Sequence, residues 1–176
     1  MKHTVQLKSF TLIELLIVVA IIGILAAIAV PNFLNAQMRA TIAKMETDMK
    51  AIGDALVMYR IDNRCYFPQM SSNPYQELMR LTTPISYIAR IPNDPYRRPG
   101  ARYVSTTTNY DYSAYGPECK TDWLLHGIGP DTDEDINVGA YGPQTADLFK
   151  GLLYQASNGI VSSGDVIHTS WRGISF

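Results

Sequence analysis

Charge, cysteine and histidine are all scarce in this sequence of 176 residues. Charged side chains make up 18% of it, below the roughly 25% of an average soluble protein, and the formal net charge is −1. An intrinsically disordered chain would be more charged and less apolar, so the composition argues against that class. It also argues against a nucleic-acid-binding protein that works by bulk positive charge, and no nucleic-acid partner is predicted.

Long apolar runs are also scarce, and only one stretch is long and apolar enough to cross a membrane. In Phe10–Val30, 18 of 21 residues are apolar, and the exceptions are Thr11, Glu14 and Gly23. At ~1.5 Å per residue, 21 helical residues reach ~31 Å, about the thickness of a bilayer core. The preceding residues 1–9 carry two lysines and no acid. This charge asymmetry predicts a cytoplasmic N-terminus and transfer of the rest of the chain across the membrane.

Two ordinary interpretations of this segment leave one residue unexplained. The first is a cleaved secretory signal, since Ala27-Ile28-Ala29 fits the small-x-small rule; however, the apolar run exceeds the usual 7–15 residues and Pro31 lies two residues past that cut. The second is a plain anchor that stays in the membrane. Neither accounts for Glu14, a carboxylate that costs a few kcal/mol in a bilayer and is by default functional.

A third interpretation explains Glu14. The residues Ser9-Phe10-Thr11-Leu12-Ile13-Glu14, and the apolar run that follows them up to Pro31, resemble the N-terminus of type IV pilins and type II secretion pseudopilins. The resemblance implies cleavage between Ser9 and Phe10 by a prepilin peptidase on the cytoplasmic side, and N-methylation of Phe10. The family usually has glycine before the cut, where this chain has Ser9. The resemblance also implies assembly by an inner-membrane platform protein and its ATPase, together with minor pilins.

Cleavage before Phe10 creates an α-ammonium group four residues before Glu14. The two charges can meet within one helix at the i, i+4 spacing, or between neighbouring subunits. Either pairing relieves a charge in an apolar environment, and removing one partner leaves the other costly. The resemblance implies the intermolecular pairing, which sets the register of a growing helical filament of identical subunits. Phe10 and Glu14 are therefore the predicted assembly residues.

Gly23 and Pro31 interrupt the helical pattern of the apolar run. Proline removes a main-chain hydrogen bond and kinks a helix, and glycine weakens it. Both residues are also frequent in membrane helices without any special role. The resemblance implies that this stretch can lose its helical hydrogen bonds in a filament, so a kink or local melting between Gly23 and Pro31 is predicted.

After Pro31 the solid apolar run gives way to an apolar stripe with steps of three and four residues. Its members are Leu34, Met38, Ile42, Met45, Met49, Ile52, Leu56 and Tyr59. The spacing predicts an amphipathic helix that ends at Asp62-Asn63. An adaptable methionine-rich binding face is one interpretation, and packing against a head domain is the other.

Residues 64–176 are expected to form a head rich in strands. A short helix is predicted after Asn73-Pro74. Tyrosine and β-branched residues predict strands at Arg102–Thr108 and Tyr110–Tyr115, and Trp123–Ile128 is a third candidate strand. The turn signal Asn158-Gly159 predicts a hairpin that joins Leu152–Ala156 to Ile160–His168. One helix followed by consecutive strands predicts an α+β fold with a small antiparallel sheet packed on the long helix, and the resemblance implies a type IV pilin-like arrangement.

Four carboxylates fall within the five residues Asp131–Asp135, with no lysine or arginine among them. Their repulsion disfavours a tight loop unless a cation screens it, and the alternating Asp131, Asp133 and Asp135 can bring oxygens toward one hard ion. The segment from Gly127 to Asp135 resembles a loop of the major pseudopilins that binds calcium. A solvated acidic loop is the alternative. Calcium is the one cofactor predicted.

Cys65 and Cys119 are the only cysteines. A disulfide is expected if the head lies outside the cytoplasm, and two buried free thiols are the alternative. Catalytic signals are missing, since the sequence has no P-loop, no dinucleotide fingerprint and no Gly-x-Ser-x-Gly. His126 and His168 lie far apart, and a zinc site would need more clustered ligands. The chain is not expected to be an enzyme.

The sequence therefore predicts a structural subunit of a type II secretion pseudopilus-like filament. Its parts are a cleaved leader at 1–9, a transmembrane or filament-core half-helix at 10–30, an amphipathic half-helix at 31–63 and the head at 64–176. The subunit is expected in the lipid of the inner membrane before assembly, single-pass, with a periplasmic or extracellular head. Two alternatives stay open: a type IV pilin of a surface fibre for adhesion, motility or DNA uptake, and a membrane-anchored secreted binding protein or hydrolase.

Overall fold

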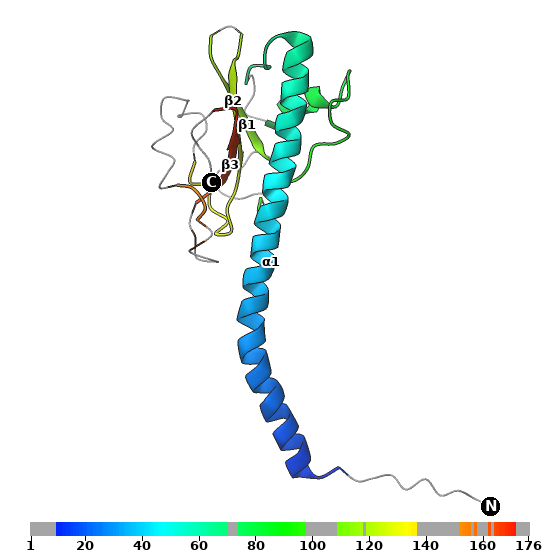
Figure 1. Cartoon of the computed structure of the whole chain (residues 1–176), viewed down its shortest axis with the longest axis vertical. Helices are drawn as coiled ribbons and strands as arrows, with labels where there is room; N and C mark the ends of the chain where they lie inside the picture. The colour runs from blue at the N-terminus through cyan, green and yellow to red at the C-terminus, as the bar shows by residue number, and fades with distance from the viewer. Residues whose placement is uncertain are drawn as a thin grey trace, which may run out of the picture. The chain divides into compact units, whose positions relative to one another are not determined.

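The computed structural model describes residues 10–69, 74–97, 109–117, 119–136, 152–155, 157, 162 and 164–171. Its elements, in chain order, are helix α1 (Leu12–Asn63), helix α2 (Pro74–Leu78), the 3₁₀ helix η1 (Met79–Leu81), and strands β1 (Asp111–Tyr115), β2 (Asp122–Gly127) and β3 (Val166–Thr169) (Figure 1). The chain divides into two compact units, residues 1–37 and residues 38–176. Each unit is described separately below.

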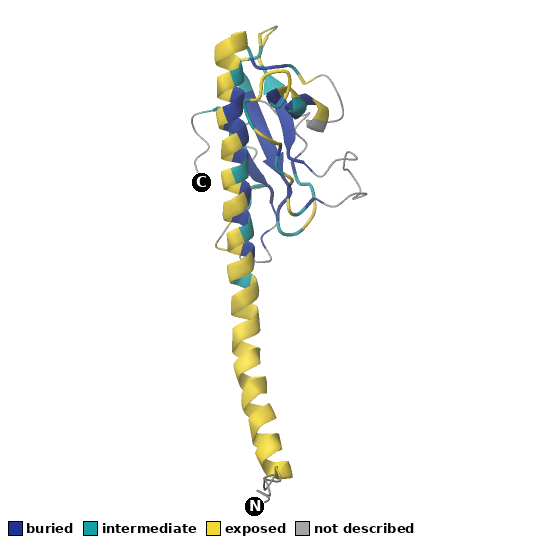
Figure 2. Ribbon diagram, turned by 90° about the vertical axis from the view of Figure 1, so that its right-hand side faces the viewer, coloured by how far each residue is buried: buried dark blue, intermediate teal, exposed yellow. Residues whose placement is uncertain are grey.

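The first unit contains the N-terminal part of α1, in which every residue from Phe10 to Leu34 is exposed (Figure 2). Helix α1 is long and apolar enough to cross a membrane, and none of its most apolar stretch is buried in the protein. The helix is unbroken through Gly23 and Pro31 in this single subunit. The predicted kink or melting between these two residues concerns the assembled filament and stays a prediction.

The second unit is built on the C-terminal part of α1, where one face of the helix is buried (Figure 2). The buried residues on this face are Met38, Ile42, Met45, Met49, Ile52, Gly53, Ala55 and Leu56. They reproduce the predicted stripe, except that Leu34 is exposed and Tyr59 only half-buried. The stripe is thus a core-packing face of the head, as the second interpretation of the methionines held.

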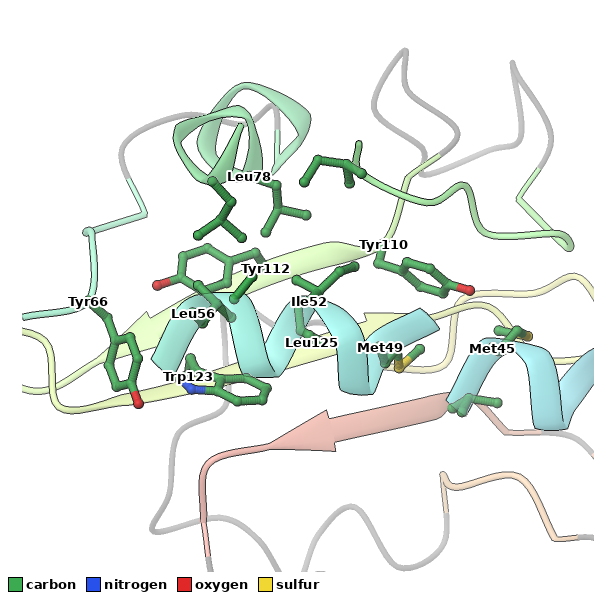
Figure 3. Close-up of a cluster of buried hydrophobic side chains, with 14 of the residues drawn as sticks. Met45, Met49, Ile52, Leu56, Tyr66, Leu78, Tyr110, Tyr112, Trp123 and Leu125 are labelled. Atoms are coloured by element: carbon green, nitrogen blue, oxygen red, sulfur yellow. The ribbon is translucent and has the colours of Figure 1, made fainter. Parts of the chain in front are cut away.

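Strands β1, β2 and β3 form an antiparallel sheet in the order β1-β2-β3. Alternate residues of the sheet face opposite sides, as the pleat requires. Tyr112 and Leu125, which are register partners, pack in the same core as the buried face of α1 (Figure 3). On the other face, Leu124 and Ile167 pack with Ile136. The sheet is therefore buried on both faces, and α1 covers only one of them.

Strands β1 and β2 and the short helix α2 confirm three of the elements predicted from sequence. The strand expected at Arg102–Thr108 and the turn at Asn158-Gly159 lie outside the described residues.

The predicted hairpin is wrong where it can be compared. Leu153 and Asp165 form an isolated parallel bridge, and β3 pairs with β2 instead. An Asn-Gly signal reports a local turn preference, whereas the pairing of β3 is decided by Val166 and Ile167, which bury one side chain on each face of the sheet.

A disulfide joins Cys65 to Cys119, with their Cα atoms 5.3 Å apart. It links the end of α1 to the segment between β1 and β2. Next to it, the Tyr66 N–H donates to the Lys120 carbonyl at 3.1 Å, which closes an isolated antiparallel bridge. The end of the long helix is therefore fixed to the sheet by one covalent and one main-chain contact.

Candidate functional site

The beginning of α1 forms a capping box around Glu14. The Glu14 Oε2 atom accepts hydrogen bonds from the Thr11 N–H at 2.9 Å and from the Thr11 hydroxyl at 2.7 Å, and the Glu14 N–H donates to the Thr11 Oγ1 at 3.3 Å. A negative charge in the first helical turn is also favoured by the helix dipole. In the isolated subunit, the glutamate predicted to guide assembly is therefore held by its own chain.

Thr11 is not among the residues predicted above, although its position in the sequence indicates a role as a helix cap. Threonine followed three residues later by glutamate is the pattern of a capping box, and here it stands directly before the apolar run. Phe10, the residue expected to become the N-terminus, is exposed immediately before the helix. Ser9, on the other side of the predicted cleavage bond, lies outside the described residues.

The head contains a buried polar network on the face of the sheet that lies away from α1. Arg97 Nη2 donates to Asp111 Oδ2, and Arg97 Nε lies 3.9 Å from Asp94 Oδ2. His126 lies between two aspartates, with Nδ1 at 3.6 Å from Asp111 Oδ2 and Nε2 at 2.9 Å from Asp165 Oδ2. All five residues are buried. Buried charges of this kind are stable only when they compensate one another.

Burial and the close approach of charged groups shift the pKa values in this network. Burial by itself lowers the pKa of His126, but the Asp111 and Asp165 carboxylates outweigh it and raise the pKa to about 9. For Asp111, burial raises the pKa, and the neighbouring His126 and Arg97 outweigh it, so the pKa falls below its usual range. For Asp94, burial prevails over its hydrogen bonds and over Arg97, and its pKa is raised.

Asp165 connects this network to the acidic loop. Its carboxylate accepts main-chain N–H groups from three loop residues, Gly129 at 3.3 Å, Asp135 at 2.9 Å and Ile136 at 2.8 Å. Asp165 is fully buried. The loop with the predicted calcium ligands is therefore anchored on one carboxylate that comes from the start of β3.

Of the three predicted calcium ligands, Asp133 is exposed, whereas Asp131 and Asp135 are half-buried. Asp131 accepts hydrogen bonds from the N–H groups of Asp133 and Gly164, both at 3.3 Å. Partial burial and the Asp165, Asp131 and Asp133 carboxylates raise the pKa of Asp135, which reports the expected mutual repulsion.

A different trio brings three candidate metal-ligand atoms close together. In the part of the chain that is described, the side chains whose ligand atoms all lie within 4.8 Å of one another are Asp111, His126 and Glu134. None of the three aspartates predicted from sequence belongs to that group.

Sequence reasoning missed Asp111 and Asp165 as partners of His126. Asp111 lies 15 residues before the histidine and Asp165 lies 39 residues after it, so no local motif joins them. One signal was available for Asp111. It is the register partner of His126 in β1 and β2, two strands that the sequence predicts.

Comparison with known protein families gives a match at the N-terminal end of the chain. Residues 8–30 match the family described as "Prokaryotic N-terminal methylation motif". That match covers the predicted cleavage bond, the capping box and the apolar run.

Longer similarities extend into the head. The chain is 33% identical over 147 residues to the type II secretion system core protein G of Dickeya chrysanthemi, which covers 75% of this chain and 88% of that protein. The protein of the same name from Pseudomonas aeruginosa is 31% identical over 149 residues, with 76% and 94% covered. That of Vibrio cholerae is 36% identical over 102 residues, with 54% and 70% covered. No solved structure matches the chain. Because the identity exceeds 30% over nearly the full length of such relatives, the chain belongs to the family of the type II secretion system core protein G.

Proposed function

We propose that this chain is the major structural subunit of a type II secretion pseudopilus, a helical filament assembled from the inner membrane. The observation that carries the proposal is the similarity to core protein G, which covers 75% of this chain and 88% of the Dickeya chrysanthemi protein. The relatives are named as secretion components, which favours a pseudopilus over a surface fibre.

The exposed apolar part of α1 suits two environments, the lipid bilayer and the core of a filament. Large apolar side chains such as Leu12, Ile13 and Ile24 are more than 60% exposed in the single chain. A surface of this kind is stable in lipid and, after extraction from the membrane, against equivalent helices of neighbouring subunits. The same residues therefore serve as the membrane anchor before assembly and as the filament core afterwards.

Processing at the N-terminus is the first step of the proposed function. A prepilin peptidase cuts between Ser9 and Phe10, and the new Phe10 amine is methylated. Mass spectrometry of the protein from cells tests this step, with an N-methylated Phe10 as the expected first residue. A protein that begins at Met1, or at Val30 after an ordinary signal cut, contradicts the proposal.

Glu14 then guides assembly. In the single chain its carboxylate is held by Thr11. In the filament, the Phe10 ammonium of an incoming subunit replaces the Thr11 donors, and the exchange of a neutral donor for a charged one favours docking in one register. The polytopic platform protein, its ATPase and the minor pilins are the partners of this step.

The Glu14→Gln variant tests this role, with Glu46→Gln as the matched control. Glu46 is an exposed acid on the C-terminal part of α1. Glu14→Gln is expected to insert and to be cleaved but to yield few filaments by electron microscopy, whereas Glu46→Gln assembles normally. Normal filaments from Glu14→Gln, or equal loss from both variants, contradict the role.

The side of the membrane on which the head lies can be read from its cysteines. Disulfides persist in oxidising compartments, so the Cys65–Cys119 bond favours a head in the periplasm or outside the cell. Denatured protein from cells is expected to resist a maleimide label until it is reduced. A variant without residues 10–30, which stays in the cytoplasm, is the control and should be labelled at once. Free thiols in the intact chain contradict the placement.

Calcium binding by the acidic loop is the last part of the proposal. The repulsion that raises the pKa of Asp135 supports a cation near Asp131, Asp133 and Asp135. Calcium is expected to raise the melting midpoint relative to a chelator, because a ligand that binds only the folded chain stabilises it. The shift should disappear when all three aspartates are changed to asparagine. No shift in the unaltered chain indicates a solvated loop instead.

A further inference from the structure

The trio Asp111, His126 and Glu134 joins two strands and a loop. Asp111 in β1 and His126 in β2 are register partners on the sheet face away from α1, and Glu134 follows β2 in the acidic loop. One ligand atom from each, a carboxylate oxygen or an imidazole nitrogen, lies within 4.8 Å of the other two. In a tetrahedral site with ~2.0–2.2 Å bonds, such atoms are roughly 3.3–3.6 Å apart, so modest side-chain adjustments close the site.

Two buried atoms of this trio have no hydrogen-bond partner among the residues that the structure describes. They are His126 Nδ1 and Glu134 Oε2. The His126 side chain is fully buried, and its Nδ1 is 3.6 Å from Asp111 Oδ2, which is too long for a hydrogen bond. Leaving a buried polar atom unpaired lowers the stability of the fold. Because both atoms belong to the same compact group, one bound cation would satisfy them together.

The surroundings of His126 suit a metal ligand. Its other ring nitrogen, Nε2, lies 2.9 Å from Asp165 Oδ2. A carboxylate at that position holds a proton on Nε2 and orients the ring, so a metal ion that displaces the Nδ1 proton would bind this nitrogen in the arrangement found behind metal-binding histidines. Arg97 donates to Asp111 in the same way and orients that carboxylate. Two of the three proposed ligands, His126 and Asp111, are therefore already oriented by neighbouring side chains.

The charge balance also favours a cation. Four carboxylates gather here against the single guanidinium of Arg97 and the imidazole of His126; they belong to Asp94, Asp111, Glu134 and Asp165. Burial penalises such a surplus of negative charge unless it is compensated. A proton on His126 compensates part of it, and a divalent ion bound at Nδ1 compensates more.

We propose that the head binds one divalent transition-metal ion, with zinc as the best fit, through Asp111, His126 and Glu134. One imidazole nitrogen and two carboxylate oxygens are typical zinc ligands, and water completes the coordination. Calcium prefers a shell of oxygens alone, so the nitrogen ligand separates this site from the calcium site proposed for the loop surface. The ion ties β1 and β2 to the acidic loop and gives this head a structural metal.

The test uses the full chain in detergent micelles after treatment with EDTA. Zinc chloride is titrated by calorimetry, and the melting midpoint is recorded with zinc and, separately, with calcium. The expected result is one zinc per chain with a raised midpoint. Glu134→Gln should weaken zinc binding at least tenfold, because Glu134 is half-buried and can be changed without opening the core. Glu46→Gln, the same chemical change at an exposed position of α1, and His168→Asn, another histidine, are the matched controls and should bind zinc as before.

A second measurement identifies the metal ligands directly, so that the conclusion does not depend on a variant that folds poorly. Cobalt(II) bound in place of zinc gives a visible absorption spectrum that depends on its ligands, and X-ray absorption detects one imidazole in the first shell. Both signals are expected in the unaltered chain and should be lost in His126→Gln. The inference is overturned if the chain binds no zinc at one equivalent, if Glu134→Gln binds it as tightly as the unaltered chain, or if the bound metal has no imidazole ligand.

Discussion

At the scale of single residues, Asp165 carries more contacts than any predicted site residue. It accepts three main-chain N–H groups of the acidic loop and faces His126, all from a fully buried position. Asp165→Asn removes the charge and turns one acceptor oxygen into a donor that points at other donors. Breaking a buried pair in this way costs about 3–5 kcal/mol, and urea unfolding of the full chain in detergent should show a loss of that size.

Asp133→Asn is the control for Asp165, because it makes the same chemical change in the same loop. The Asp133 side chain is exposed and accepts one local N–H, from Glu134. With a chelator present, so that no calcium is bound, its unfolding free energy should stay within about 0.5 kcal/mol of the unaltered chain. Equal losses in the two variants would mean that the loop tolerates no change of charge anywhere, and that Asp165 has no special position.

His168 predicts a pH dependence of stability. Its ring packs on Trp123, with centroids 5.4 Å apart, and burial lowers its pKa, while the nearby Asp54 and Lys50 charges oppose each other. A histidine whose pKa is lowered by folding stabilises the fold above its unfolded value of about 6.5 and loses that contribution as the pH falls. The loss should stay below about 1 kcal/mol, because the ring is only half-buried.

His168→Phe is the variant that isolates this effect, because it keeps an aromatic ring on Trp123 and removes the titration. When the pH is lowered from 7.5 to 5.5, the urea midpoint of the unaltered chain should fall further than that of the variant. If both chains lose the same stability, the titration responsible lies elsewhere in the head.

At the scale of elements, the long helix shows how far a sequence pattern reaches. Apolar residues at steps of three and four predict α1 and its buried face, because helix period and burial are local consequences of residue order. The observed end at Asn63 matches the predicted end. Strands β1 and β2 are also recovered, since aromatic residues such as Tyr112 and Trp123 are typical of half-buried strands.

Pairing between distant segments is the part that local pattern cannot supply. The Asn158-Gly159 signal suggested an antiparallel hairpin, yet Leu153 and Asp165 pair in parallel. The polar network has the same character, since Arg97, His126 and Asp165 come from three separate segments. Which of these segments meet is decided by the packing of the whole head, not by residues near them in the sequence.

The stripe on α1 makes a quantitative prediction with a matched pair of methionines. Met49 is fully buried in the main core, whereas Met58, nine residues further along the same helix, is 53% exposed. Met49→Ala leaves a cavity and should cost about 2–5 kcal/mol of unfolding free energy. Met58→Ala should change it by less than about 0.5 kcal/mol, because alanine is a better helix former and little buried surface is lost.

Urea unfolding of both variants, followed by circular dichroism, checks this pair. Similar losses from Met49→Ala and Met58→Ala would show that burial of the Met49 side chain adds nothing to stability beyond what an exposed methionine contributes. In that case the face of α1 would not be the core surface described above.

At the scale of the whole molecule, the chain uses its apolar residues in two opposite ways. From residue 10 to residue 34 they are exposed, whereas from Met38 onwards a stripe of them is buried in the head. The averages for the sequence conceal this division, because a nearly neutral, moderately apolar composition is the sum of an apolar segment and a polar, tyrosine-rich head. Neither part alone meets the needs of a filament subunit, which must leave lipid and still keep a folded head.

The disulfide gives the last prediction, because it connects segments 54 residues apart. In the chain-entropy account, closing a loop of that length removes freedom from the unfolded chain and contributes about 4 kcal/mol to stability. Replacing Cys65 and Cys119 together by serine should therefore lower the unfolding free energy by up to about 4 kcal/mol. The head should keep its native circular dichroism spectrum, because the Tyr66 and Lys120 main-chain bridge and the Phe67 core contacts still hold that segment on the sheet.

The unaltered chain in reductant is the control for this change, because it loses the same bond without any substitution. Its urea midpoint should fall to that of the double variant, and reductant should leave the double variant itself unaffected. An unaltered chain that is equally stable with and without reductant would mean that the unfolded state is already compact around these two residues. The bond would then act as a link between α1 and the sheet during assembly and not as a source of stability in the free subunit.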